Sequence, residues 1–173
     1  MNKKIVVIGG GAAGMMAALS AAEQGAQVTL LEPNERLGKK LNITGKGRCN
    51  VTNNCTVEEL LAHIPRNGKF LYSALVRFTS ADAMAFLEGI GVPLKTERGN
   101  RVFPVSDCAF DVSGALKKRM EKLGVRWEHD RAVSLLVEEG AINALAGSSE
   151  VPWYIVGDKP TAKSVQVDYL NGV

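Results

Sequence analysis

Three glycines near the start of the chain, Gly9, Gly11 and Gly14, have the spacing G-x-G-x-x-G. In this pattern the first glycine makes a tight turn, the second lets a backbone approach a pyrophosphate, and the third lets a helix pack on a strand. Ala13 lies in the same turn and is counted with the candidate binding residues. Glu32 follows about 20 residues later, where a carboxylate can accept both hydroxyls of an adenosine ribose. These residues predict a dinucleotide site, and the acid disfavours a 2′-phosphate such as that of NADP.

A second stretch, LNITGKGRCNVTNNC at 41–55, supplies groups that suit a diphosphate. Cationic side chains donate to phosphate oxygens, glycines permit close backbone approach, and hydroxyl or amide groups add neutral hydrogen bonds. The candidate residues are Thr44, Gly45, Gly47, Arg48 and Asn50 in this stretch, and Lys39 and Lys40 immediately before it. A solvated basic face is the plain alternative. RNA binding is a further one, but the stretch lacks the interleaved aromatic residues that stack bases.

The cysteines and histidines of the chain indicate neither redox nor metal chemistry. Cys49 and Cys55 are separated by five residues in a loop rich in Asn and Thr, and we interpret Cys49 as a small packing residue. His63 and His129 have no ligand partners at metal spacing, so no metal site is predicted. No residue can be named as a catalytic acid or base.

The elements that must position these groups begin with a strand at 3–8, a helix at 12–24 and a strand at 27–32. The glycine pattern follows a strand and opens a helix, which is the context that a dinucleotide site requires. Strand, helix and strand form a βαβ unit, whose two strands we expect to be parallel. The stretch from 33 to 56 is rich in Gly, Asn and Thr and predicts a long loop, and loops of that length are usually functional or disordered.

Further along the chain, helical and strand patterns alternate up to about residue 138. Thr56 and Glu59 predict a capping box, Ser80 a second N-cap, Gly99-Asn100 a hairpin turn, and Asp107 and Asp111 caps at a helix start. The predicted elements are helices at 56–62, 69–78, 80–89 and 111–123, a hairpin at 93–104, and strands at 125–128 and 132–138.

Composition places the chain among ordinary globular proteins. It has 173 residues, 46% of them hydrophobic, and a net charge of +3 that is too small to imply nucleic acid. Three cysteines at irregular spacing argue for a reducing compartment, so we expect a cytoplasmic protein. No apolar run is long enough to span a membrane, and a glycine triplet interrupts the only segment that resembles a signal peptide. We therefore expect neither membrane nor nucleic acid as a partner.

The sequence resembles the flavoproteins called BaiN-type or aminoacetone-oxidase-type, a branch of the glutathione-reductase-like FAD proteins. The residues that carry the resemblance are the fingerprint glycines and Glu32, LGKKLNITGKGRCNVTN at 37–53, and RVFPVSD at 101–107, and it covers about residues 1–137. It implies an α/β, Rossmann-like (GR2-type) FAD-binding fold with a parallel sheet. FAD would bind with its adenosine at Glu32, its pyrophosphate at the first helix, and the 37–50 loop along its phosphates and ribityl chain. Val133 would lie in a strand whose backbone meets the adenine edge.

The resemblance stops near residue 140, so the sheet and the flavin site are expected to be incomplete. We assign 1–140 to the N-terminal portion of an FAD-binding domain and 141–173 to an atypical tail. WYIVGD in that tail resembles a strand followed by Gly-Asp that completes the sheet in related flavoproteins. The expected function is an FAD-dependent oxidoreductase, or a truncated fragment of one, with NAD(P)H a candidate electron donor and its small-molecule substrate unknown. A dinucleotide-binding remnant without catalysis is the alternative.

Overall fold

The computed structural model describes residues 3–138, 141–147 and 153–155, with side chains for residues 3–135. The chain divides into two compact units. The first unit comprises residues 1–39 and 117–173, and the second comprises residues 40–116. The assignment of residues 1–140 to one portion of a domain and 141–173 to a tail stays a prediction.

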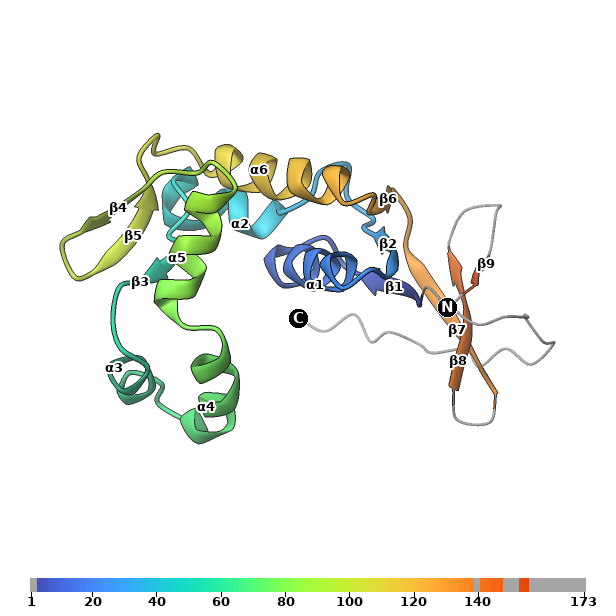
Figure 1. The fold of residues 1–173 in the computed structure, drawn as a ribbon, viewed down its shortest axis with the longest axis horizontal. Helices are drawn as coiled ribbons and strands as arrows, with labels where there is room; N and C mark the ends of the chain where they lie inside the picture. The colour runs from blue at the N-terminus through green and yellow to red at the C-terminus, as the bar shows by residue number, and fades with distance from the viewer. Residues whose placement is uncertain (1–2, 139–140, 148–152, 156–173) are drawn as a thin grey trace. The chain divides into compact units, whose positions relative to one another are not determined.

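The first unit contains the predicted βαβ arrangement, formed by β1 (Lys4–Ile8), α1 (Ala12–Glu23) and β2 (Gln27–Leu31). Strand β6 (Arg126–Glu128) adds to the far side of β2, which gives a three-stranded sheet of order β1-β2-β6. Both pairings are parallel (Figure 1). In the pairing of β1 with β2, Val6 lies opposite Thr29. The predicted α/β fold with a small, incomplete parallel sheet is therefore confirmed.

Helix α1 forms because it is rich in alanine, methionine and leucine, which are good helix formers. Gly11 is its N-cap, and Gly25, with φ +82°, provides the left-handed residue that ends it. Its buried side chains Met15, Ala18 and Leu19 face the sheet, and α1 contacts both β1 and β2. Four successive residues of β2, from Val28 to Leu31, are also buried, as expected for a parallel strand.

A second sheet in the first unit is antiparallel and has the order β7-β8-β9, formed by β7 (Ala132–Glu138), β8 (Ala141–Gly147) and β9 (Trp153–Ile155). The sequence predicted β7 and the strand at WYIV but not β8, whose alanines and glycine give little strand signal. Strand β9 pairs with β8 rather than with the parallel sheet. Gly157-Asp158 lies outside the described residues.

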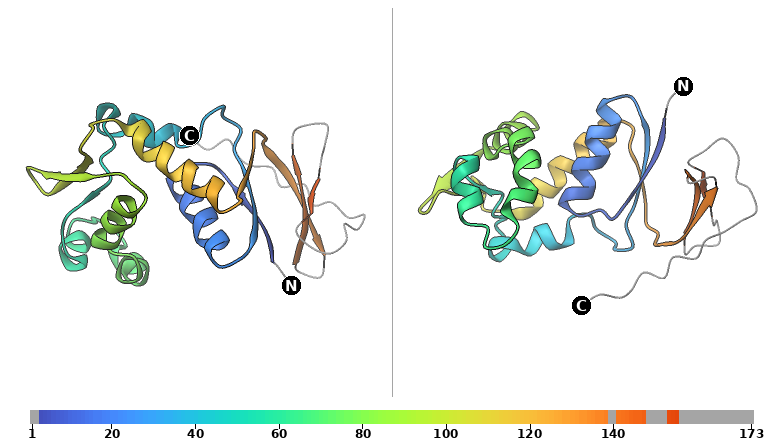
Figure 2. Two further views of the ribbon diagram at one scale, coloured as in Figure 1. Left: turned by 45° about the horizontal axis from the view of Figure 1, so that its top comes forward. Right: turned by 90° about the horizontal axis from the view of Figure 1, so that it is seen from below.

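The second unit combines short helices with an antiparallel sheet of order β3-β5-β4. Gly99 and Asn100 both have positive φ, which suits the predicted turn of the β4–β5 hairpin; Figure 2 shows this hairpin from two further sides. Helix α6 continues into the first unit. The elements are α2 (Lys39–Ile43), the 3-10 helix η1 (Thr44–Gly47), β3 (Thr52–Asn53), α3 (Val57–Ala62), α4 (Gly68–Arg77), α5 (Ser80–Gly89), β4 (Leu94–Glu97), β5 (Arg101–Pro104) and α6 (Ala109–Lys122).

Several local predictions are corrected or confirmed in this unit. The stretch 33–56 is not one long loop, because it contains α2, η1 and β3. The N-cap of α5 is Thr79 rather than Ser80. The Thr79 hydroxyl accepts from the Asp82 N–H, and the Asp82 carboxylate accepts from the Thr79 N–H. The capping box of Thr56 and Glu59 is confirmed. Within the described residues, no helix combines the length and apolar character needed to cross a membrane.

Candidate functional site

The glycine-rich turn joins β1 to α1 in the first unit. Gly9 has φ +98°, a left-handed conformation, and its N–H donates to the Leu31 carbonyl at 2.8 Å. The first N–H groups of a helix have no acceptor within the helix, and Gly11 has no side chain that could cap them. Gly14 and Ala13 lie in this first turn of α1. The turn therefore presents backbone donors at the positive end of the helix dipole.

The glycines of this turn are required for different reasons. A Cβ added to Gly14 would lie 1.8 Å from the Gly9 carbonyl oxygen, so only glycine allows α1 to pack this close to the turn. A Cβ on Gly11 would meet no protein atom within 4 Å. Glycine at 11 is therefore not demanded by packing, which is the pattern expected where a ligand's phosphates approach the backbone.

Glu32 lies directly after β2 and is buried, with 8% of its surface exposed. Its Oε2 accepts the Gly10 N–H at 2.7 Å, and its Oε1 accepts both the backbone N–H of Asn34, at 2.8 Å, and the Asn34 side-chain amide. A carboxylate offers about four acceptor sites. One acceptor position, on Oε2, therefore remains for a ribose hydroxyl, and a second would require Asn34 to move.

Gly10 and Asn34, which the sequence pattern did not indicate as site residues, also belong to this turn and its surroundings. The Gly10 carbonyl accepts from the Gly38 N–H at 2.8 Å, and a Cβ on Gly10 would lie 2.4 Å from Leu37 and 3.0 Å from the Glu32 Cβ. Asn34 accepts a bond from the Lys39 ammonium at 3.2 Å. A side chain at position 10 would thus require Leu37 and Glu32 to shift, although the G-x-G-x-x-G pattern leaves that position open.

The loop from Thr44 to Asn50 lies in the second unit and has an unusual backbone. Gly45, Lys46, Gly47 and Cys49 have φ values of +57°, +59°, +86° and +62°, all in the left-handed region. A Cβ on Gly45 would approach Phe103 at 2.9 Å and the Asn50 nitrogen at 3.1 Å, which explains glycine there.

Cys49 is buried within this loop, with 3% of its surface exposed. Burial raises the pKa of its thiol, and a hydrogen bond with Thr44 opposes that shift. The thiol is therefore held in its less reactive form, as its interpretation as a packing residue requires. Cys49, Cys55 and Cys108 are all free thiols.

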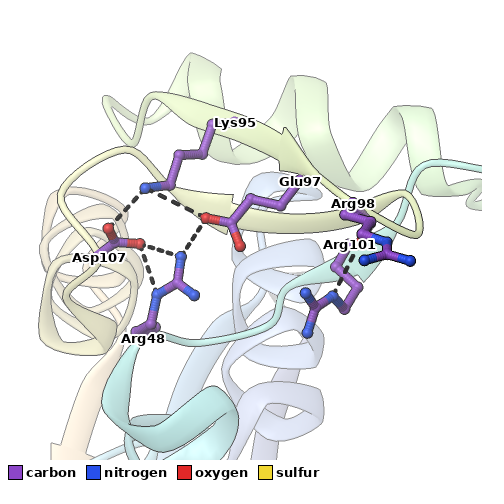
Figure 3. Close-up of polar contacts among 6 residues, drawn as sticks. All are labelled: Arg48, Lys95, Glu97, Arg98, Arg101 and Asp107. Atoms are coloured by element: carbon purple, nitrogen blue, oxygen red, sulfur yellow. Dashed lines mark hydrogen bonds and ion pairs between the residues drawn. The ribbon is translucent and has the colours of Figure 1, made fainter.

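Arg48 does not extend freely from this loop. Its Nε donates to Asp107 at 2.8 Å and its Nη2 donates to Glu97, while its guanidinium lies 4.2 Å from the centre of the Phe103 ring. Lys95 completes the cluster through an ion pair with Asp107 at 2.7 Å (Figure 3). The hydrogen bonds from Arg48 lower the pKa of Glu97, and those from Lys95 and Arg48 lower that of Asp107. Asp107, expected from the sequence to cap a helix, instead joins this cluster.

The predicted site residues thus fall into two sets. The fingerprint glycines, Ala13, Glu32 and Lys39 belong to the first unit, and Glu32 contacts the turn directly. Lys40, Thr44, Gly45, Arg48 and Asn50 belong to the second unit. Val133 is half-exposed in β7, where the pairing with β8 shifts between Ala132 and Ser134. Among the residues that the structure describes, no group of three metal-ligating side chains gathers.

Comparison with known proteins places this geometry in a family. The model of the HI0933-like protein Rossmann domain matches residues 3–150. The chain belongs to this family. The resemblance to BaiN-type flavoproteins that the fingerprint and the 37–53 stretch carried is thereby confirmed.

Curated relatives of this HI0933-like chain include enzymes named for different substrates. It is 35% identical over 128 residues to a 3-dehydro-bile acid delta(4,6)-reductase of Clostridium scindens, covering 73% of this chain and 30% of the relative. It is 30% identical over 122 residues to a ribosomal RNA dihydrouridine synthase of Haemophilus influenzae, covering 70% of this chain and 29% of the relative. The chain therefore spans about 30% of the length of these relatives.

Solved structures share the fold of this HI0933-like chain at low sequence identity. Sdh1 of Mycobacterium smegmatis, solved in complex with UQ1, matches with a TM-score of 0.60 and 20% identity, covering 85% of this chain and 30% of that one. THI4 of Thermovibrio ammonificans matches with a TM-score of 0.57 and 14% identity, covering 90% of this chain and 54% of that one. At these identities the likeness concerns the fold.

Proposed function

We propose that this chain binds FAD and forms part of an FAD-dependent oxidoreductase. The observation that carries the proposal is the turn between β1 and α1. Gly11, at the N-terminus of α1, leaves open space beside the backbone, while Gly14 is forced by packing. Membership of the HI0933-like family supports FAD rather than NAD as the dinucleotide.

Each residue of the first unit has a defined part in this proposal. The backbone around Gly9, Gly11, Ala13 and Gly14 binds the pyrophosphate through N–H groups and the helix dipole. Glu32 fixes the turn through Gly10 and uses its remaining acceptor capacity for the adenosine ribose. Lys39, held near Asn34, contributes positive charge.

The residues of the second unit, together with Val133 of the first unit, enter the proposal through the family resemblance. Lys40, Thr44, Gly45, Arg48 and Asn50 would help to bind the flavin, and the backbone at Val133 would meet the adenine. FAD, when bound, supplies transfer of hydride or electrons, and the protein's part is to bind and orient it. NAD(P)H is the proposed electron donor.

The substrate is left open by this proposal, because the curated relatives are named for a bile acid and for ribosomal RNA. Both names belong to proteins of which this chain spans about 30%, so neither substrate is transferred to it. Free cysteines support the cytoplasmic location that we propose.

The test is the visible spectrum of the purified chain after incubation with FAD and removal of unbound FAD by gel filtration, compared with that of Gly11→Val treated in the same way. Because no protein atom lies within 4 Å of a Cβ at Gly11, the variant should stay folded, with a melting temperature lowered only by the poorer N-cap of α1, and should lose flavin binding. Glu32→Ala is less informative, since Glu32 also holds Gly10 and Asn34. Glu35→Ala, an exposed acid three residues further on, is the matched control and should bind FAD normally.

A chain that melts cooperatively but retains no flavin absorbance after excess FAD has been removed would contradict the proposal and favour the non-catalytic remnant. Equal FAD affinity of the wild type and Gly11→Val would contradict the assigned site. Oxidation of NADH with an artificial acceptor then tests NAD(P)H as the electron donor.

A further inference from the structure

The loop from Thr44 to Cys49 holds a backbone that its sequence does not favour. Lys46 and Cys49 are not glycine, yet both have left-handed φ values, +59° and +62°. Residues of this kind persist only where surrounding contacts determine the conformation, and they concentrate at functional sites. Something outside the loop must therefore hold it.

One face of the loop is held by packing and backbone bonds. Cys49 is 3% exposed, and its N–H donates to the Thr44 carbonyl at 3.1 Å. Gly45 lies against Phe103 of β5, and the Val51 N–H donates to the Val102 carbonyl at 2.9 Å. These contacts fix where the loop begins and ends, but they do not fix the Lys46–Gly47 segment.

Arg48 supplies the second attachment. It bonds to Glu97 at the end of β4 and to Asp107 after β5, so its side chain ties the loop to both ends of the hairpin (Figure 3). The Phe103 ring beneath it adds a cation–π contact at 4.2 Å. The loop is thus held to β4, to β5 and to the segment that follows.

The charges of this cluster cancel. Arg48 and Lys95 contribute two positive charges, and Glu97 and Asp107 contribute two negative ones. A phosphate that bound Arg48 would have to displace one of the two carboxylates from the guanidinium, or share the guanidinium with both of them. A compensated guanidinium is therefore a poor phosphate ligand, although the sequence pattern suggests one.

We propose that Arg48 is a positioning residue, which holds the Thr44–Cys49 loop in its flavin-binding conformation through Glu97 and Asp107 and does not itself contact the FAD phosphates. This inference rests on the proposed function. It reassigns Arg48 from the candidate ligands to the contacts that fix the loop.

The two roles predict opposite results for the acids. If Arg48 positions the loop, replacing its partners in Glu97→Gln/Asp107→Asn should weaken FAD binding as much as Arg48→Gln does. The triple variant should then lose nothing more, because all three changes remove the same two ion pairs, Arg48–Glu97 and Arg48–Asp107. If Arg48 were a phosphate ligand, removing the acids would free its charge, and FAD would bind equally well or more tightly.

Binding kinetics separate the roles again. A loop that is competent for only a fraction of the time reduces the apparent affinity by that fraction. Stopped-flow mixing of the flavin-free chain with FAD should therefore show an association rate about tenfold lower in Arg48→Gln and in the double acid variant. The dissociation rate should change less than about twofold. Loss of a direct ligand would instead appear mainly in faster dissociation.

Limited trypsin digestion provides a readout that needs no flavin. Cleavage of the Lys46–Gly47 bond, scored by mass spectrometry in the flavin-free chain, should be several times faster in both variants than in the wild type. Arg119→Gln is the matched control, because it removes one arginine from an ion pair, with Glu23 at 2.8 Å in the first unit. It should change neither the cleavage nor the FAD association rate.

The outcomes are distinguishable. If wild-type chain binds no FAD, the proposed function fails and this inference fails with it. If the wild type binds FAD but the double acid variant binds as well as the wild type, only the inference is overturned. Unchanged cleavage at Lys46 in Arg48→Gln would also overturn it, since the loop would then be held without Arg48. Arg48→Lys, which keeps the charge but not the two-sided hydrogen bonding, should behave like Arg48→Gln.

Discussion

Glycines in this chain differ in whether a side chain would fit at their position, and the atoms around each one show which case applies. A Cβ at Gly14 would be 1.8 Å from the Gly9 carbonyl, whereas a Cβ at Gly114, within α6, would meet nothing within 4 Å. Both residues lie within helices, where glycine is less favourable than alanine by about 1 kcal/mol. Only at Gly14 does close packing of the helix against the turn compensate for the lower helix propensity of glycine.

The same substitution should therefore have opposite signs at the two positions. Gly14→Ala should lower the free energy of unfolding by at least about 1–3 kcal/mol, because the new methyl group forces the turn away from α1. Gly114→Ala should raise it by about 0.5–1 kcal/mol. Urea unfolding followed by circular dichroism measures both, and a neutral Gly14→Ala would show that α1 does not pack as described.

Whether the sequence could predict the role of a single residue depended on how far away along the chain its contact partners lie. Gly9, Gly11 and Gly14 were identifiable because a turn and a helix start are local. The partners of Arg48 were not, because Glu97 and Asp107 lie 49 and 59 residues away from it. A basic loop beside glycines therefore predicted a phosphate ligand, and only the fold reveals that its arginine is already paired.

Secondary-structure elements were predicted well where a periodic pattern was long enough to recognise. The βαβ unit, the hairpin and the helix that begins at Ala109 follow their patterns closely. Helix α2 has five residues and η1 has four, too short for a helical period to emerge from a sequence rich in Gly, Asn and Thr. The N-cap of α5 shifted from Ser80 to Thr79 because both residues can cap, and Asp82 lies three residues after Thr79.

The attachment of the 44–49 loop to the β4–β5 hairpin should depend on pH. Hydrogen bonds from Arg48 and Lys95 hold the pKa values of Glu97 and Asp107 below those of the unfolded chain. Their stabilising contribution is therefore complete above the unfolded values, near pH 4, and is lost as the pH falls through the folded values. The urea midpoint of the wild type should fall more between pH 6 and pH 3 than that of Glu97→Gln/Asp107→Asn.

The N-terminal cap of α5 provides an internal reference for that comparison. Bonds with Thr79 also lower the pKa of Asp82, and both chains keep this group. Both should therefore lose some stability in acid, and only the difference between them reports on the cluster. Equal losses would mean that Arg48 gains nothing from the two carboxylates, which would also weaken its assignment as a positioning residue.

At the scale of the whole molecule, apolar surface is distributed unevenly. Helices α3 and α4 contain no buried residue, and the large exposed side chains of the second unit include Phe70, Leu71, Tyr72, Val76 and Phe78. Such a concentration is unusual for a surface and marks a contact region or an aggregation liability. The sequence did not reveal it, because an amphipathic helix pattern indicates which face is apolar but not whether another element covers it.

This surface leads to a prediction about the chain in isolation. Phe70 is 86% exposed and Tyr72 is 52% exposed, so Phe70→Lys/Tyr72→Lys removes apolar surface without opening a cavity. The free energy of unfolding should change by no more than about 0.5 kcal/mol per site, as for surface substitutions generally. Concentration-dependent light scattering should fall, because two cations replace two exposed aromatic rings. Leu87→Lys, at a position only 6% exposed on α5, is the contrasting control and should unfold the second unit. If the double variant were as destabilised as Leu87→Lys, α4 would have to be packed in solution, with its aromatic rings forming part of a core.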